Sequence, residues 1–465
     1  DVSDDIEIPP PLEVKLPAAP DLGPLEGWSP PEECAPGKMP VIGESECQWI
    51  GTPCPEGDWP AELPEGELRF VTPGGTGDGS SQAQAMGSIQ EAVNTVAEDG
   101  TVVLSKGRFE QNVVVDRSVN LLGTCARDSV IVGVGDVPAE GLDRGTDSEV
   151  LFAPGFLADA STILIRGAHS RSLQDLGIGG ARVGLAILEG SLLLQGISSS
   201  QNKLFGIVGN AVSGQLQITA KQVAVSETQV SEAHGVPALF STQVWGMGIL
   251  LTSVAGELTA SFDEVSLQQI GGFGLWAEWG SFQFENCVIQ GSGTQAAEGG
   301  DGLHAGTLAA VEAERIYITQ TTATPLACNK CQMSADTVLL EDNIGLGAIL
   351  VSDDGLPDQR AMLTTRNTLI RGLSTFVAEN VDPTNGFLAG FGMGGLVMGG
   401  VLAMERVHIE NVRAAGVMAW ESSFFCAQED FCGGSEIRLV DVTILDVQPD
   451  ARGQMGDGIA AVDGA

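Results

Sequence analysis

Residues 284–289 (FENCVI), 313–318 (AERIYI) and 335–340 (ADTVLL) share one pattern. Each begins with a small or apolar residue, which two polar residues follow. The last three positions are an apolar residue, a variable residue and a second apolar residue. Closely related patterns occur at ten places, with the residue after the polar pair at positions 176, 197, 223, 265, 287, 316, 338, 368, 407 and 442. The shortest intervals are 21 residues (176 to 197) and 22 residues (265 to 287 and 316 to 338). Such a period is typical of stacked repeat architectures.

A second apolar run, led by glycine, follows many of these segments: GLAIL, GIVG, GMGILL, GLWAEW, GLHAG, GAILV, GVMAW and GIAAV. Each repeat therefore predicts a strand, a two-residue bend, a strand, a loop and a third strand. A single repeat cannot bury its inner face, so stacking of repeats must supply the core. We predict an all-β fold, a right-handed parallel β-helix with three short strands per rung. Asn286 and Asn367 share the second bend position, where we expect stacked side-chain amides to hydrogen-bond.

The segments before the repeat predict three regions. Residues 1–33 are rich in proline and acidic residues, which predicts an extended linker. Residues 34–66 form a short cysteine-bearing segment that disulfides would have to hold together. From residue 67 to 465 we expect the β-helix, preceded by a capping helix at about residues 88–97. Ser88 and Glu91 fit a capping box there, and Gly100 ends the apolar periodicity.

The stretch after this helix, DGTVVLSKGRFEQNVVVDRSVNLLG (99–123), resembles the start of pectin-lyase-like β-helix proteins, especially pectin methylesterases. The resemblance covers about residues 86–133. The cysteine-bearing stretch CAPGKMPVIGESECQWIGTPCPEG (34–57) resembles the N-terminal cysteine-containing segments of secreted or lipoprotein β-helix proteins of myxobacteria and their relatives. These resemblances imply an exported protein at the extracellular face, outer-membrane surface or periplasm of a Gram-negative bacterium, with an N-terminal lipid anchor.

Charge narrows the range of partners. The chain has 61 acidic residues against 22 Lys and Arg, a net charge of −39. This charge disfavours nucleic acid and anionic membranes, and leaves a protein or a polysaccharide at the cell surface as the expected partner. No cofactor is predicted, although calcium suits so acidic a surface. Residues 386–404 form an uncharged run of 19, which we interpret as a glycine-rich rung and not a membrane helix.

The nine cysteines favour disulfides over zinc, because the chain has one CxxC and four scattered histidines. Cys287 takes an inward position of the repeat, so we expect it to be a free, buried thiol. We predict Cys328–Cys331 and Cys426–Cys432 as local disulfides. Two further bonds would join Cys34, Cys47, Cys54 and Cys125, with the pairing left open.

No catalytic residue is assigned from the sequence. The ordered NTD, DD, GHG and RIK motifs of polygalacturonase-like enzymes are not found, and Arg315 is interpreted as a solvated bend residue. The favoured function is therefore a non-catalytic cell-surface or extracellular protein that binds a partner or builds an assembly. The alternative is a carbohydrate-active enzyme (polysaccharide lyase, esterase or glycosidase) with a divergent carboxylate site. A groove that gathers Asp or Glu with Arg or Lys would favour the enzyme.

Two surfaces are expected to contact partners. Five phenylalanines in two inserts are candidate contact residues in a chain poor in aromatics: Phe387, Phe391, Phe424, Phe425 and Phe431. The alternative is that these rings fold back over the rungs as local lids. The last rung, around residues 458–462, lacks a recognisable cap. We expect either further chain or a stacked subunit to cover it.

Overall fold

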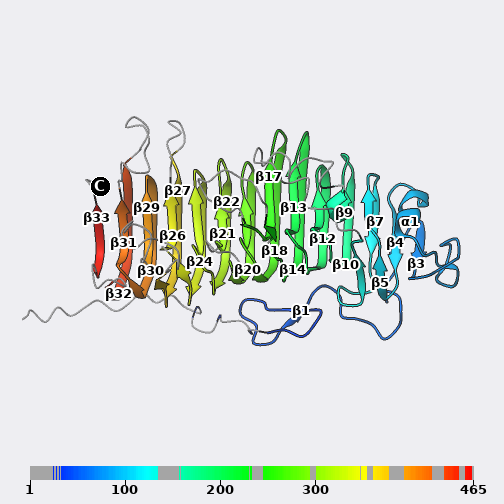
Figure 1. The fold of residues 1–465 in the computed structure, drawn as a ribbon, viewed down its shortest axis with the longest axis horizontal. Helices are drawn as coiled ribbons and strands as arrows, with labels where there is room; N and C mark the ends of the chain where they lie inside the picture. Colours follow the sequence, from blue (N-terminus) through cyan, green and yellow to red (C-terminus); the bar gives the residue numbers. More distant parts are fainter. Residues whose placement is uncertain are drawn as a thin grey trace, which may run out of the picture.

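The computed structural model describes residues 25, 28, 31, 33–134, 157, 159–229, 231–232, 244–293, 300–345, 347–352, 360–375, 392–420, 434–449 and 456–462. Within these residues the chain is a right-handed parallel β-helix, as the repeat predicts. The helix α1 (Ile89–Thr95) lies at one end of the solenoid and β33 (Asp457–Val462) at the other (Figure 1). The parallel pairing of strands from successive rungs therefore confirms the β-helix that the repeat predicts.

Two long sheets run along the solenoid, and from β10 onward each rung adds one strand to each sheet. The larger sheet has fifteen strands among the described residues: β3 (Leu68–Val71), β4 (Gly100–Leu104), β5 (Gly107–Glu110), β7 (Val119–Leu122), β8 (Ser129–Val132), β10 (Ser170–Gly179), β12 (Gly190–Ser200), β14 (Gln215–Ser226), β18 (Glu257–Ile270), β20 (Ser281–Ser292), β22 (Ala310–Thr319), β24 (Gln332–Glu341), β27 (Met362–Arg371), β30 (Gly400–Arg413) and β32 (Ser435–Gln448). All the neighbouring strands of this sheet pair in parallel.

The smaller sheet has twelve strands in the described part of the chain: β6 (Val113–Val115), β9 (Ser161–Ile165), β11 (Val183–Ile187), β13 (Phe205–Ala211), β17 (Met247–Ser253), β19 (Leu275–Ala277), β21 (Leu303–Ala305), β23 (Leu326–Asn329), β26 (Gly347–Ser352), β29 (Met393–Met398), β31 (Ala415–Trp420) and β33. Three two-stranded pairs complete the strands: β1 (Lys38–Met39) with β2 (Gln48–Trp49), β15 (Ser231–Glu232) with β16 (Val244–Trp245), and β25 (Ile344–Gly345) with β28 (Ser374–Thr375). A short 3₁₀ turn, Gln82–Gln84, precedes α1.

The first two strands of each predicted rung form one bent strand of the larger sheet. The ladder between β10 and β12 pairs Gln174 with Gln195 and then Leu176 with Ile197, and passes over Asp175. The second residue of every predicted polar pair is left-handed, with φ between +48° and +64°: Asp175, Gly196, Gln222, Glu264, Asn286, Arg315, Thr337, Asn367, Arg406 and Asp441. A single left-handed residue turns the chain, so the sheet continues around the corner without losing its register.

The inward positions of the bent strands fill the core. In β20 the residues Phe282, Phe284, Cys287 and Ile289 are at most 2% exposed and belong to one cluster that extends from α1 to β32. The thiol of Cys287 is free and buried, and burial raises its pKa far above the usual range. Each rung therefore closes the core of its neighbours, and stability is shared along the stack.

Glycine is required at the start of the third strand of a rung, because the backbone of the next rung lies too close to leave room for a side chain. A Cβ on Gly274 would lie 2.6 Å from the carbonyl oxygen of Gly302 and 2.9 Å from Cγ2 of Ile289. The same contact recurs in the uncharged run 386–404, where a Cβ on Gly394 would lie 2.5 Å from the carbonyl oxygen of Gly416. The described part of that run, residues 392–404, therefore forms β29 and the start of β30, within the solenoid. No helix among the described residues is long and apolar enough to cross a membrane.

The capping helix is shorter than the predicted span of 88–97. The Ser88 hydroxyl accepts a hydrogen bond from the backbone N–H of Glu91, at 3.1 Å, as in a capping box. The helix ends at Thr95, because Val96 adopts an extended conformation and is buried in the solenoid core. The helix thereby covers the core of the first rungs.

The described residues of the N-terminal region pack along the outside of the solenoid. Leu25 and Trp28, which lie within the segment predicted as an extended linker, are buried in a cluster with outward residues of four rungs: Val288, Tyr317, Leu339 and Leu369. The segment from residue 34 to 66, called the cysteine arm below, follows the same side toward the first rungs (Figure 1). Its residues Met39 and Ile50 pack on Ala126 of the solenoid.

Candidate functional site

A groove of about 640 Å³ crosses six rungs on the outer face of the larger sheet, from β14 to β27. Outward and inward side chains alternate in these strands, as the burial of β20 and β22 shows. The outward positions form two columns of side chains. One column contains Gln217, Thr259, Ser281, Ala310, Gln332 and Met362, and the other contains Thr219, Ser261, Gln283, Glu312, Ser334 and Thr364.

Hydroxyl and amide groups dominate this surface, which we call the neutral groove. Glu312 is the one charged residue in its lining. Its carboxylate accepts a hydrogen bond of 3.2 Å from the Gln283 side chain. The groove can therefore form many hydrogen bonds with a ligand, but its lining lacks the second carboxylate that most glycosidases need.

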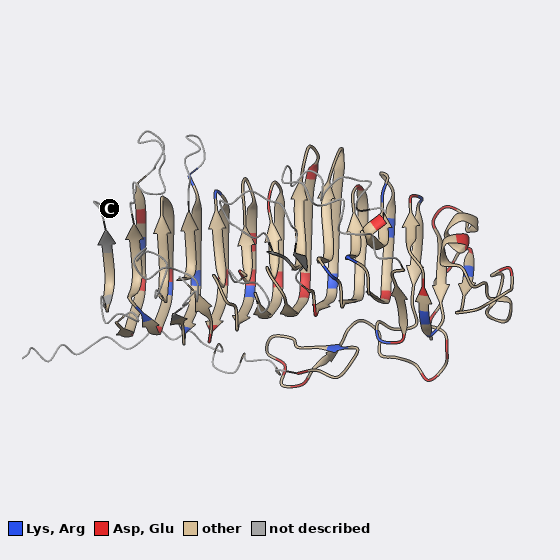
Figure 2. Cartoon of the chain, viewed as in Figure 1, with Lys and Arg blue, Asp and Glu red and all other residues tan. Residues whose placement is uncertain are grey.

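A charged row borders the groove where the strands bend. Figure 2 shows acidic and basic positions in this part of the strands, below mostly uncharged faces. The row forms ion pairs between rungs: Lys221 with Asp263 at 3.2 Å, Arg315 with Glu285, and Arg366 with Glu405 at 3.1 Å. Arg315 lies at a bend, as the sequence predicts, but it is paired and its side chain is only partly exposed.

The expected stacking of Asn286 on Asn367 is wrong. These residues lie on β20 and β27, which are separated by β22 and β24. Between them, the second bend position holds Arg315 and Thr337. Each asparagine instead donates a hydrogen bond of 2.7 Å to a carboxylate of the preceding rung, Asp263 or Asp336.

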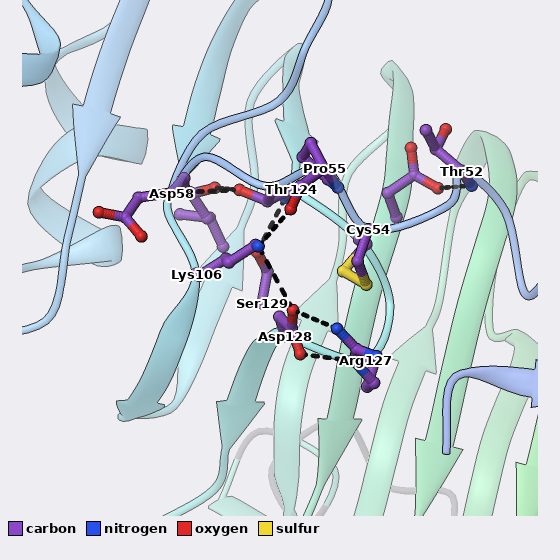
Figure 3. Close-up of a disulfide and its surroundings, with 12 residues drawn as sticks. Thr52, Cys54, Pro55, Asp58, Lys106, Thr124, Arg127, Asp128 and Ser129 are labelled. Carbon is purple, nitrogen blue, oxygen red and sulfur yellow. Dashed lines mark hydrogen bonds and ion pairs between the residues drawn. A yellow bond between two sulfur atoms is a disulfide. The ribbon is translucent and has the colours of Figure 1, made fainter. Parts of the chain in front are cut away.

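A disulfide clamps the cysteine arm to the first rungs. Cys54 is bonded to Cys125, and Figure 3 shows the surrounding contacts. The Thr124 hydroxyl donates to the Asp58 carbonyl at 3.0 Å, and the Lys106 ammonium donates to the Pro55 carbonyl. The cysteine arm is therefore fixed both covalently and by hydrogen bonds.

A second contact between the cysteine arm and the solenoid depends on two glycines. A Cβ on Gly51 would lie 2.6 Å from Cα of Gly196. Among the ten left-handed bend residues that end the predicted polar pairs, Gly196 is the one glycine. Beside them, Oδ1 of Asp175 accepts a hydrogen bond of 2.7 Å from the backbone N–H of Thr52. Burial raises the pKa of Asp175, and the hydrogen bond from Thr52 partly opposes that shift.

The cysteine pairs that the sequence left open are Cys34–Cys47 and Cys54–Cys125. Cys328 and Cys331 form a local disulfide. Cys426 and Cys432 lie outside the described residues, as do the five candidate contact residues Phe387, Phe391, Phe424, Phe425 and Phe431. Those expectations therefore stay predictions.

Among the described residues, one group has the spacing of a metal site: Cys54, Cys125 and Asp128. The two sulfur atoms are bonded to each other, so they cannot act as thiolate ligands. This group is therefore part of the clamp on the cysteine arm, and it does not support a metal site.

An aromatic cluster with a buried histidine lies on the outer face of the smaller sheet. The rings of Trp276 and His304 are stacked, with centroids 3.9 Å apart and an angle of 11° between their planes. Nδ1 of His304 lies 2.6 Å from Oδ2 of Asp301, and Phe273 packs edge-on against Trp276. The sequence analysis missed this cluster, although aligning the runs GLWAEW and GLHAG places Trp276 and His304 at equivalent positions of neighbouring strands.

Comparisons with known proteins leave the function open. No family model matches the chain, and no curated protein matches it. The solved structures that resemble it include a pectate lyase, Pel9A, with 12% identity, 75% of this chain and 80% of that chain covered, and a TM-score of 0.44. An endo-xylogalacturonan hydrolase from Aspergillus tubingensis has 11% identity, 85% and 99% coverage, and a TM-score of 0.39. At these values the comparisons assign neither an activity nor a residue role to this chain.

Proposed function

We propose that the protein is a non-catalytic binding protein, and that its neutral groove holds an extended, uncharged glycan chain. The observation that carries this proposal is the composition of the groove. Eleven of the twelve outward side chains are uncharged, and nine of these carry a hydroxyl or amide group. Because neighbouring rungs are about 4.8 Å apart, these groups repeat along the groove at a spacing that suits a hydroxyl-rich polymer.

The same composition argues against the alternative of a carbohydrate-active enzyme. Glycoside hydrolysis normally uses two carboxylates on either side of the scissile bond. Glu312 has no carboxylate partner in the lining, and Asp263 and Asp336 at the bends are hydrogen-bonded to asparagines. The groove is therefore suited to binding without an acid–base pair.

Net charge supports a neutral ligand over a polyanion. The chain carries −39 charges in total, and acidic residues lie along the bend row that borders the groove. A polyanion would be repelled at long range and would find few cations in the groove. An uncharged polymer avoids both penalties.

The disulfides support an exported protein. Structural disulfides persist in oxidising compartments, and the described part of the chain has two in the cysteine arm and one at Cys328–Cys331. We further propose that the protein is extracellular, at the outer-membrane surface or in the periplasm of a Gram-negative bacterium, which is what the resemblance of residues 34–57 implies. Fractionation of cells that express the full-length protein tests this placement.

The proposed site is tested by blocking the groove. Ser334→Trp places a large ring over the middle rungs, and Gln283→Ala removes one amide together with its bond to Glu312. Gln448→Ala, at an exposed position of β32 outside the groove, is the matched control. In affinity electrophoresis with soluble glucan, xylan, mannan and galactan, the wild-type and control proteins should be retarded by at least one neutral polymer. Ser334→Trp should abolish that retardation. Equal retardation of all three variants would contradict the site.

A further inference from the structure

A concave surface at the first rungs collects positive charge in a chain that is otherwise strongly acidic. It has a volume of about 460 Å³ and is lined by Lys106, Gly107, Arg108, Arg127, Asp128 and Val130. These residues belong to β5, β8 and the segments that lead into them. Three of the 22 basic residues of the chain thus face one pocket, called the cationic pocket here, that contains a single carboxylate.

Asp128 holds two of the three cations in place. Nε and Nη2 of Arg127 donate to its two oxygens at 2.7 and 2.9 Å, and Nζ of Lys106 lies 3.7 Å away. The hydrogen bond from Arg127 lowers the pKa of Asp128, so this carboxylate stays ionised at neutral pH. Three cations and one anion leave the lining with a charge of +2, of which Glu110, beside Arg108 but outside the lining, offsets a part.

Free donors remain in the cationic pocket. Arg108 has an exposed side chain, and its Nε lies 3.4 Å from Oε1 of Glu110. Within the described part of the chain, its two terminal nitrogens make no hydrogen bond, and neither does Nη1 of Arg127. Guanidinium groups of this kind match the geometry of a tetrahedral oxyanion.

The support of the pocket is rigid. The disulfide Cys54–Cys125 lies beside it, and Lys106 also donates to the Pro55 carbonyl (Figure 3). The Ser129 hydroxyl donates to the Ser105 carbonyl at 2.9 Å and accepts from the backbone N–H of Thr124 at 2.8 Å. A ligand would therefore meet Lys106 and Arg127 already in position, which reduces the entropy lost on binding.

We propose that the cationic pocket binds a tetrahedral dianion of the phosphate-monoester class. Such a group carries about −1.5 to −2 charges at neutral pH, which matches the charge of the lining, whereas a carboxylate neutralises half of it. The net charge of the chain does not prevent this, because salt screens exposed charges beyond about 10 Å at 0.1 M. This site lies on β5 and β8, apart from the neutral groove on β14 to β27, and it does not depend on the proposed function.

Titration calorimetry with inorganic phosphate, at about 0.1 M ionic strength and slightly alkaline pH, tests this proposal on the full chain. The wild-type protein should bind phosphate saturably, and Arg108→Gln should bind about fivefold more weakly, which corresponds to about 1 kcal/mol. Arg438→Gln is the matched control, because Arg438 is also an exposed strand residue paired with a glutamate two positions away. It should bind phosphate like the wild type.

A second variant and a second anion complete the test. Val130→Glu adds a negative charge to the lining and should abolish phosphate binding while the circular dichroism spectrum stays native. Acetate should fail to displace phosphate. The proposal is overturned by any one of three results: no saturable binding by the wild type, equal binding by Arg108→Gln and Arg438→Gln, or displacement by an equal concentration of acetate.

Discussion

Replacing Gly274 by alanine should destabilise the solenoid through a backbone collision. The added methyl group would lie 2.6 Å from the carbonyl oxygen of Gly302 and 2.9 Å from Ile289 Cγ2. That carbonyl accepts the ladder hydrogen bond from Leu275 N–H, at 2.9 Å, so relief of the contact weakens the bond. Overpacking costs about 1–3 kcal/mol and a lost backbone hydrogen bond about 1 kcal/mol. The lower entropy of the unfolded alanine variant offsets about 0.5–1 kcal/mol.

We therefore expect Gly274→Ala to lower the free energy of unfolding by about 2–3 kcal/mol. Urea unfolding followed by circular dichroism measures this change. Gly458 is the matched control, because it occupies the same column in β33 and a Cβ there would meet no atom within 4 Å. Gly458→Ala should change the free energy by less than about 0.5 kcal/mol. If both variants unfold like the wild type, or if both lose the same stability, the close-approach argument is refuted.

Three further predictions concern the cysteine arm and the core. Asp175→Asn keeps the oxygen that accepts the hydrogen bond from Thr52 and removes a buried charge. Because the pKa of Asp175 is raised in the folded state, the wild-type protein loses stability as the pH rises. In thermal melts the variant should therefore have the higher melting temperature at neutral pH, and this difference should vanish below about pH 4. Replacing Cys54 and Cys125 together by alanine opens a loop of 71 residues and should cost about 4 kcal/mol in urea unfolding; an unchanged midpoint would contradict the clamp. Cys287 should resist alkylation by iodoacetamide in the native protein and react after denaturation, as measured by mass spectrometry; fast labelling of the native thiol would show that it is not buried.

The corners of the rungs could be predicted from the sequence, because residues at inward positions are apolar and residues at the bends are mostly polar. The second residue of each predicted polar pair, from Asp175 to Asp441, is left-handed in the structure. A second left-handed column, five residues further along each rung, was not predicted. It includes turn-favouring residues such as Asp342 and Asn411, but also Gln201, Glu227 and Gln320, residue types that carry no turn signal. The ladders on both sides fix the backbone at these corners, so the local sequence does not have to specify it.

The candidate site was less accessible to sequence reasoning. The neutral groove consists of outward residues such as Thr219, Gln283 and Ser334, which look like ordinary solvent-exposed strand positions until six rungs are stacked in register. The contact of Gly51 with Gly196 joins segments 145 positions apart (196 minus 51), and no repeat pattern relates them. Long-range contacts of this kind arise from tertiary packing and leave no periodic signal.

Binding of a neutral glycan in the neutral groove, without cleavage, can be measured in one experiment. The full-length protein is incubated with the neutral polymer that retards it in electrophoresis. Bound fraction and polymer chain length are then determined in the same sample. We predict saturable binding with no new reducing ends and no change in chain length, for the wild type and for Glu312→Gln alike. Shortened chains that disappear with Glu312→Gln would contradict this prediction and would identify the groove as the active site of an enzyme.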